Sequence, residues 1–250
     1  MMQLIHRPLI ARLIHKIAAD YRMQVPNGIS LTGIVGILLT ILGIGMAFQS
    51  GFSPMNGLLI VVGIGLTLPR IVIGLALNRF KGIRYHVRDA IVSNVQWRGY
   101  EQVLDVGTGS GLMLFGCAKQ LTTGKATGID LFLPDSGGGT AEIFWKNAQH
   151  EGLDDRVDLR IMDARDMLFE ANCFDVIVSS SALHHIGNVE HRRRANLEML
   201  RVLKAGGRIV VFDLRVVLRE LEILMQDAGF ENITMRGGGE HALIFADKPA

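Results

Sequence analysis

A stretch of 47 residues without a charged side chain, from Met23 to Pro69, most constrains what this chain can fold into. Two apolar runs, at about 29–48 and 57–77, begin within this stretch and are separated by a polar turn. Each run is about 20 residues long, and a helix of that length spans the hydrocarbon core of a bilayer. The pattern predicts a transmembrane helical hairpin within a membrane anchor at 1–85.

The distribution of charge predicts how that anchor is oriented. Residues 1–90 contain nine Lys and Arg against two Asp and Glu, whereas residues 91–250 contain 17 against 22. Basic residues flank the apolar runs and the turn between them has none, so the positive-inside rule places both flanks in the cytoplasm. We therefore expect an integral protein of the inner or plasma membrane whose C-terminal part faces the cytoplasm. The acidic balance of that part argues against a nucleic acid partner.

Three further features of the N-terminal part have two interpretations each. A small-residue stripe, which lets helices pack closely, predicts a contact within the hairpin or between copies in a homo-oligomer. Arg70 is either a functional intramembrane charge or a side chain that extends to the headgroups. Residues 1–22 are either a helix on an anionic membrane surface or a basic flank. The stripe consists of Thr32, Gly36, Thr40, Gly43 and Ala47.

From residue 86 onward, short apolar runs alternate with longer helical patterns. Strands are predicted at 102–106, 125–129, 157–162, 174–179, 207–212, 231–235 and 241–246. Helices are predicted at 86–96, 111–120, 139–151, 189–203 and 215–228. This alternation predicts an α/β domain over 86–250 with a doubly wound, mostly parallel seven-stranded sheet, in which the last two strands form an antiparallel hairpin.

The first predicted strand leads into a glycine-rich loop, VLDVGTGSG at 103–111. Glycines let the backbone turn sharply and let a ligand approach it closely. Asp130, at the end of the next strand, can accept hydrogen bonds from both hydroxyls of a ribose. Loop and acid together indicate an adenosine-containing ligand. The loop has neither the G-x-G-x-x-G spacing of a dinucleotide site nor the Lys of a P-loop.

Several sequence blocks in a fixed order resemble the class I S-adenosylmethionine-dependent methyltransferases. The likeness is greatest to the branch that includes the ubiquinone and menaquinone biosynthetic methyltransferases. The blocks are VLDVGTGSG, GIDLF, MDARDM at 162–167, FDVIVSSSALHHI at 174–186, LRVLKAGGRIVVFDL at 200–214 and AGF at 228–230. The resemblance implies a Rossmann-like methyltransferase fold over about 86–250 and S-adenosyl-L-methionine as the cofactor.

The same resemblance implies roles for individual residues. The methionine moiety would be held by Asp105, Gly107, Thr108, Gly109 and Gly111, the ribose by Asp130 beside Leu131, and the adenine by Asp163 and Ala164. Ser179, Ser180 and Ser181, at the end of the fourth strand, would face the sulfonium and the acceptor. His184 and His185 are the candidate catalytic bases. Alternatively, one of them packs beneath the next helix and the other lines the cofactor pocket; His184 is preferred if one is catalytic.

The chain departs from the family pattern after the fifth strand. Quinone methyltransferases usually insert a helical lid there, whereas here VVFDL continues almost directly into the next helix. We expect the membrane hairpin to provide that cover, and the acceptor to be a lipophilic small molecule such as a quinone precursor, a lipid or an isoprenoid. A catalytically silent membrane adaptor and a nicotinamide-dependent oxidoreductase are the alternatives. The spacing of the histidines predicts no metal site.

Overall fold

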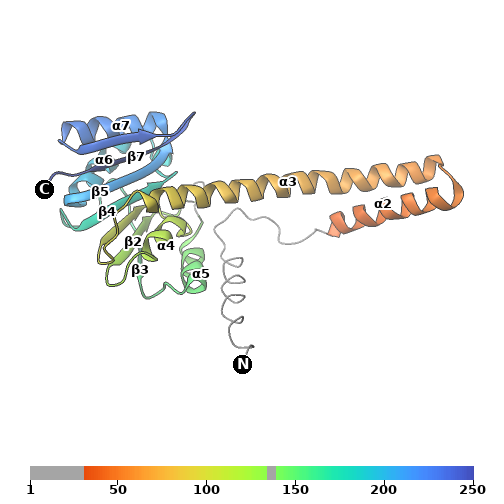
Figure 1. Ribbon diagram of the computed structural model, residues 1–250, viewed down its shortest axis with the longest axis horizontal. Helices are drawn as coiled ribbons and strands as arrows, with labels where there is room; N and C mark the ends of the chain where they lie inside the picture. The colour runs from red at the N-terminus through yellow and green to blue at the C-terminus, as the bar shows by residue number, and fades with distance from the viewer. Residues whose placement is uncertain (1–30, 134–138) are drawn as a thin grey trace, which may run out of the picture. The chain divides into compact units, whose positions relative to one another are not determined.

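The computed structural model describes residues 31–133 and 139–250 of the chain (Figure 1). The described residues belong to two compact units with a boundary between Arg84 and Tyr85. The segment 1–22, predicted to be a membrane-surface helix or a basic flank, lies outside the described residues, and so does the side chain of Arg70.

The unit before the boundary is a pair of helices packed through small residues. Helix α2 spans Leu31–Ser50 and helix α3 begins at Pro54. A Cβ atom added at Gly36 would lie 2.8 Å from the carbonyl oxygen of Gly63 on α3, so the two backbones are in close contact there. The predicted stripe of small residues therefore supplies a contact between α2 and α3 of one chain.

The two helices differ from the sequence-based expectation in two respects. Within the part of the chain that the structure describes, no helix is both long enough and apolar enough to cross a membrane. The prediction of two transmembrane helices is therefore not supported. Helix α3 is also continuous over Pro54–Ser93 and includes Pro69, so the separate helix predicted at 86–96 is its C-terminal end. A proline removes one backbone donor, but the other hydrogen bonds of a long helix can remain.

The unit after the boundary is built on a seven-stranded sheet of order β3-β2-β1-β4-β5-β7-β6. Strands β1 to β5 are parallel, and β7 is antiparallel to both of its neighbours, β5 and β6. The strands are β1 (Gln102–Val106), β2 (Lys125–Asp130), β3 (Val157–Ile161), β4 (Phe174–Ser180), β5 (Leu203–Leu214), β6 (Glu231–Arg236) and β7 (His241–Asp247). The predicted doubly wound sheet with a terminal antiparallel pair is confirmed.

Helices cover both faces of this sheet. Side chains alternate between the two faces along each strand, and the consecutive apolar residues of the central strands therefore need cover on both sides. On β5, Val210 packs with residues of α3, α4 and α5, whereas Val211 packs with residues of α6 and α7. Figure 1 shows α6 and α7 beside the C-terminal strands. The helices are α4 (Leu112–Ala118), α5 (Ala141–Glu151), α6 (Val189–Val202) and α7 (Arg215–Asp227), with the short 3-10 helix η2 at Leu183–His185.

Two features of the topology position the site. Strand β1 lies between β2 and β4, and ligands of open parallel sheets bind beyond the strand ends at such a reversal of strand order. Strand β5 ends at Leu214 and α7 begins at Arg215, so the chain has no insertion there, as the sequence predicts. Strand β5 starts earlier than predicted, at Leu203, where it pairs with Phe174 next to an irregularity in register.

Candidate functional site

The glycine-rich loop after β1 needs glycine at three positions. Gly107, Gly109 and Gly111 have φ angles of +73°, +52° and +92°, in the left-handed region that favours glycine. A Cβ atom on Gly107 would also overlap the Cβ of Ala182, in the loop after β4. The loop can therefore approach its neighbours, and a ligand, more closely than other residues would allow.

Asp130, at the end of β2, connects the glycine-rich loop to its own strand. Its Oδ2 accepts a hydrogen bond of 2.8 Å from the amide of Gly109, and its Oδ1 accepts one of 2.7 Å from the amide of Phe132. A carboxylate has about four acceptor positions, so both oxygens keep a free lone pair for further donors. Asp130 can therefore order the loop and still accept hydrogen bonds from the hydroxyls of a ligand.

Asp105 lies beneath the loop and is buried. Its Oδ2 accepts a hydrogen bond of 3.1 Å from the amide of Leu114, whereas its Oδ1 has no partner among the residues that the structure describes. Burial raises the pKa of Asp105 to about 7, and the nearby negative charge of Asp130 acts in the same direction. A buried acceptor without a partner, below the loop predicted to hold a cationic ligand, fits the role that the resemblance implies.

A cavity of about 220 Å³ lies at the carboxyl ends of β1, β2 and β4. Of the residues predicted from the sequence, the cavity is lined by Gly107, Asp130, Leu131, Asp163, Ala164, Ser181 and His185. Asp105, Thr108, Gly109, Gly111, Ser179, Ser180 and His184 are not part of its lining. Gly109 and Gly111 belong to the glycine-rich loop, whose Gly107 lines the cavity, and Asp105 lies on β1 beneath that loop.

Asp163, predicted to contact the adenine, is paired with an arginine that the sequence analysis did not single out. Nη2 of Arg165 lies 2.6 Å from Oδ2 of Asp163, and its Nε lies 3.0 Å from Oδ1. These hydrogen bonds lower the pKa of Asp163, which therefore stays ionised. Both side chains line the cavity. The MDARDM block contains this arginine, so the signal was present in the sequence.

The three serines at the end of β4 have different roles. The hydroxyl of Ser179 is buried and donates a hydrogen bond of 2.7 Å to the carbonyl oxygen of Val106, which joins β4 to β1. Ser180 is half-buried and lies outside the cavity lining, whereas Ser181 lines the cavity with a φ of +53°. The residue of this run that lies at the cavity is therefore Ser181, which follows the end of the strand.

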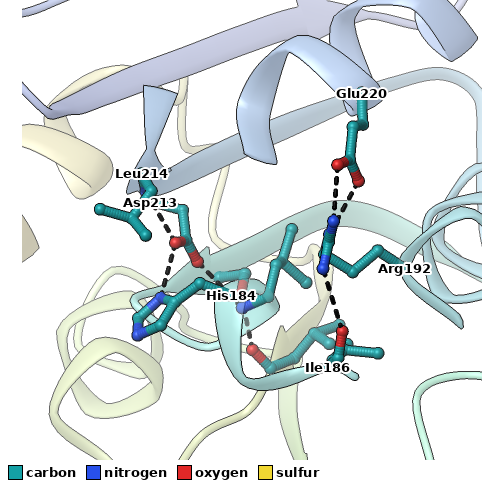
Figure 2. Close-up of polar contacts among 9 residues, drawn as sticks. His184, Ile186, Arg192, Asp213, Leu214 and Glu220 are labelled. Carbon is teal, nitrogen blue, oxygen red and sulfur yellow. Dashed lines mark hydrogen bonds and ion pairs between the residues drawn. The ribbon is translucent and has the colours of Figure 1, made fainter. Parts of the chain in front are cut away.

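The two adjacent histidines of η2 have different surroundings. His185 lines the cavity, where partial burial lowers its pKa and neighbouring His184 has the same effect. His184 instead contacts Asp213 near the end of β5 (Figure 2). Asp213 is fully buried and was not predicted as a site residue, although the VVFDL block contains it. The alternative that one of the two histidines lines the cofactor pocket agrees with the position of His185.

Together these groups suit an adenosine-containing cation. The carboxylates in the cavity can accept hydrogen bonds from hydroxyl and amine groups of a ligand, and the glycine-rich loop lets a ligand lie close to the backbone. Val106, Ile129 and Ile186 form apolar parts of the wall. Pockets for small ligands commonly combine apolar walls with a few placed polar groups. Within the described residues, no cluster of His, Cys, Asp and Glu is arranged to hold a metal ion.

Comparisons with known proteins agree with this description. Residues 104–211 match the family described as a methyltransferase domain. Over 132 residues the chain is 32% identical to a ubiquinone/menaquinone biosynthesis C-methyltransferase of Ruegeria sp., and this match covers 53% of the chain and 50% of the relative. Over 123 residues it is 28% identical to a demethylmenaquinone methyltransferase of Symbiobacterium thermophilum, covering 49% and 46%. The chain thus spans about half the length of these relatives.

A third relative is named for a sterol rather than for a quinone. The chain is 32% identical over 111 residues to a sterol 4-C-methyltransferase of Caenorhabditis elegans, covering 44% of the chain and 30% of the relative.

Solved structures share the fold at low sequence identity. The [4+2]-cyclase SpnF aligns with a TM-score of 0.55 and 20% identity over 66% of this chain and 82% of its own. A SAM-dependent methyltransferase of Aquifex aeolicus aligns with a TM-score of 0.52 and 19% identity over 64% and 88%. Together with the family match, these similarities support a Rossmann-like methyltransferase domain that uses S-adenosylmethionine.

We predict that Asp130→Ala weakens the binding of S-adenosylmethionine by about 100-fold or more. Two hydrogen bonds to a carboxylate contribute about 1.5–3 kcal/mol each, and the variant also releases the amide of Gly109. Calorimetric titration of the full chain in detergent measures this loss. The matched control is Asp158→Ala, a half-buried carboxylate on β3 that pairs with Arg160 and should leave the affinity unchanged. Equal affinity in wild type and Asp130→Ala would contradict the assignment.

We also predict a pH-dependent stability that Asp105→Asn removes. Because its pKa in the folded protein is about 7, above the ordinary 3.8, the folded state binds more protons than the unfolded state between these values. The free energy of unfolding that Asp105 contributes therefore decreases as pH rises from about 4 to 7, by roughly 1 kcal/mol per pH unit. Denaturant titrations at several pH values measure it. Wild type and Asp105→Asn should diverge as pH rises, whereas Asp158→Asn should follow wild type; parallel curves for all three would contradict the prediction.

Proposed function

We propose that this protein transfers a methyl group from S-adenosylmethionine to a lipophilic small-molecule acceptor, such as a quinone precursor, a lipid or an isoprenoid. The observation that carries the proposal is the cavity at the ends of β1, β2 and β4, where Asp130 and Asp163 lie beside the glycine-rich loop. When bound there, S-adenosylmethionine would supply a methyl group that is already electrophilic, so the protein's main task is to align the acceptor with it.

The residues that line the cavity provide the groups needed to hold the cofactor. Asp130 would accept hydrogen bonds from the ribose hydroxyls, and Asp163, kept ionised by Arg165, would accept one from the adenine amine. Gly107 lines the cavity with backbone that carries no side chain, which leaves room for the methionine moiety. These roles follow from the resemblance, and the geometry of each group is compatible with them.

Two observations favour a lipophilic acceptor. The rim of the cavity exposes large apolar side chains, with Leu131 39% and Leu133 57% accessible, and exposed apolar surface at a pocket favours apolar ligands. The direct passage from β5 to α7 at Leu214 and Arg215 leaves that side of the site without an inserted lid. The relatives, which include a demethylmenaquinone methyltransferase and a sterol 4-C-methyltransferase, point to the same class.

The test is methyl transfer by the full chain in detergent micelles, with S-adenosylmethionine labelled in its methyl group. A demethylmenaquinol with a short isoprenoid side chain, a sterol and a bacterial lipid extract serve as acceptor probes. We expect label in the organic phase with at least one probe, in proportion to the S-adenosylhomocysteine formed. Asp130→Ala should lose this transfer, because it lacks the ribose contacts, whereas Asp158→Ala should keep it.

Binding of S-adenosylmethionine without transfer to any of these probes would contradict the proposed activity. That result would favour the alternative of a membrane adaptor that retains a cofactor-binding domain.

We further propose that helices α2 and α3 associate with the inner or plasma membrane, with the methyltransferase domain on the cytoplasmic side. Large apolar side chains on both helices are exposed, among them Leu38, Ile41 and Val61, which are 60%, 61% and 68% accessible. Contiguous apolar surface of this kind is typical of protein or membrane contacts. Lys81 and Arg84 follow the apolar part of α3, where basic residues favour anionic lipid headgroups.

Flotation of the full chain with vesicles of phosphatidylcholine and phosphatidylglycerol tests the membrane proposal. We expect wild type to float with the vesicles and to remain bound at 0.5 M salt, because apolar burial is not screened by ions. The triple variant Leu38→Asn, Ile41→Asn and Val61→Asn should stay in the aqueous fraction. Ile223→Asn, an equally exposed apolar residue on α7, is the matched control and should float. A wild-type chain that does not float would overturn the proposal.

A further inference from the structure

A histidine and a buried carboxylate form a pair beside the cavity that the proposed cofactor contacts do not use. Nδ1 of His184 lies 2.7 Å from Oδ1 of Asp213, near the end of β5 (Figure 2). Asp213 is fully buried, whereas the side chain of His184 is 26% accessible. The carboxylate of the pair is therefore shielded from solvent, whereas the imidazole is partly accessible.

The backbone around Asp213 satisfies its carboxylate. Oδ2 accepts a hydrogen bond of 2.9 Å from the amide of Leu183, and Oδ1 accepts one of 2.7 Å from the amide of Leu214. Burying an ionised carboxylate is unfavourable unless donors surround it, and here two amides and the imidazole do so. The three contacts hold the carboxylate in one orientation toward His184.

This arrangement determines which ring nitrogen of His184 carries the proton. An ionised carboxylate only accepts hydrogen bonds, so Nδ1 must be the donor in the neutral imidazole. The other nitrogen, Nε2, then has a free lone pair, which is the state required of a base. Among the residues that the structure describes, Nε2 of His184 has no hydrogen-bond partner.

The imidazole lies on the segment that forms one wall of the cavity. Ser181 and Ala182 before it, and His185 and Ile186 after it, all line the cavity. The ring centroids of His184 and the lining residue His185 are 4.1 Å apart, so the two rings are in contact beside the cavity. The side chain of His184 is 26% accessible, which leaves part of the imidazole open to a molecule bound beside this segment.

An ion pair fixes the far end of the same segment. Arg192 of α6 lies 2.7 Å from Glu220 of α7 (Figure 2). Its Nη1 also donates a hydrogen bond of 3.0 Å to the carbonyl oxygen of Gly187. The segment is thus held by Asp213 at η2 and by Arg192 at Gly187. Such anchoring keeps a reactive side chain in a defined position.

We propose that His184 is the proton acceptor of methyl transfer, that Asp213 is its positioning residue, and that the acceptor substrate carries an acidic hydroxyl group, as a phenol, a quinol or an enol does. This inference rests on the proposed function and adds to it the chemical class of the methylated group. It gives Asp213, which sequence analysis did not single out, a defined role.

The proton transfer balances without a further reactant. The O–H bond of the acceptor breaks, its electron pair stays on the oxygen, and the proton forms a bond to Nε2 of His184. The resulting imidazolium is stabilised by the carboxylate of Asp213 at Nδ1. The acceptor, now an anion, is the stronger nucleophile at its oxygen or at the carbon next to the oxygen-bearing carbon. In the second case the hydrogen on the methylated carbon leaves as a proton and its electron pair stays in the product. The proton on the imidazolium later passes to solvent. Positioned bases of this kind contribute about 10²–10⁴-fold to rate.

The groups close to the imidazole come from three elements. The carboxylate of Asp213 on β5 accepts a hydrogen bond from Nδ1, the ring of His185 lies beside that of His184, and Arg192 of α6 contacts Gly187 and Glu220 on the far side of the segment. Of these groups, Asp213 is the one in hydrogen-bond contact with the imidazole.

Nitrogen-15 NMR of the histidine-labelled full chain tests the pair without an activity assay. We expect His184, assigned by its loss in His184→Gln, to carry its proton on Nδ1 and to show a strongly downfield proton resonance at that nitrogen. Asp213→Asn should shift this resonance upfield, and Asp175→Asn, a half-buried carboxylate at the start of β4, should not change it. A proton on Nε2 in the wild type would overturn the proposal, and this measurement does not depend on the folding of the Asp213 variant.

Kinetics with the demethylmenaquinol probe provide the second test. His184→Gln should lower kcat by about 10²–10⁴-fold with little change in the KM for S-adenosylmethionine. His150→Gln, on α5, should behave as wild type. Transfer by His184→Gln at the wild-type rate would overturn the proposal while the proposed function stands. A wild-type chain that methylates none of the probes would instead contradict the proposed function, and the NMR result would be unaffected.

Discussion

The methyltransferase domain depends on hydrogen bonds that join polar side chains at the ends of its parallel strands to the backbone around them. Asp105 on β1 holds the amide of Leu114, and Asp130 on β2 holds the amide of Gly109. Buried polar groups at the edge of a sheet must find partners, because leaving them unpaired costs about 1–3 kcal/mol each. The loops that satisfy the strand ends are the loops that form the cavity, so the contacts that stabilise the fold also shape the site.

The same principle explains why neighbouring polar residues have different roles. Ser179 is the sixth of seven residues in β4, and its hydroxyl is taken up by the carbonyl oxygen of Val106 on the adjacent strand. Ser181 follows the strand, has a φ of +53°, and lies at the cavity. The side chain of the serine inside the strand hydrogen-bonds to the adjacent strand, whereas the side chain of the serine just after the strand can contact a ligand. The boundary of the strand therefore decides which serine lies at the cavity, and sequence patterns locate such boundaries only to within a few residues.

Sequence reasoning predicted the elements whose signals are local and missed those that depend on distant pairing. The sequence pattern predicted β1 with its observed bounds, Gln102–Val106, because its apolar residues are consecutive or nearly so, as in strands that are covered on both faces. Helix α3 was not predicted as one continuous element, because the change from apolar to basic residues after residue 77 indicated the end of a membrane span. Asp213 could not be identified as a partner of His184, because 29 residues separate them and the parallel pairing of β4 with β5 brings them together.

Asp105 on β1 and Asp213 on β5 are both buried, and their different surroundings point to different uses. Asp105 has one amide partner and an oxygen without one among the described residues, and burial raises its pKa to about 7. A cationic ligand near it would favour the ionised form, so binding of S-adenosylmethionine and loss of that proton should be coupled. Asp213 has two amides and an imidazole as partners, and its negative charge acts on His184. One carboxylate can thus respond to the cofactor and the other can orient a base for the acceptor, which places the two chemical requirements of methyl transfer at the ends of β1 and β5.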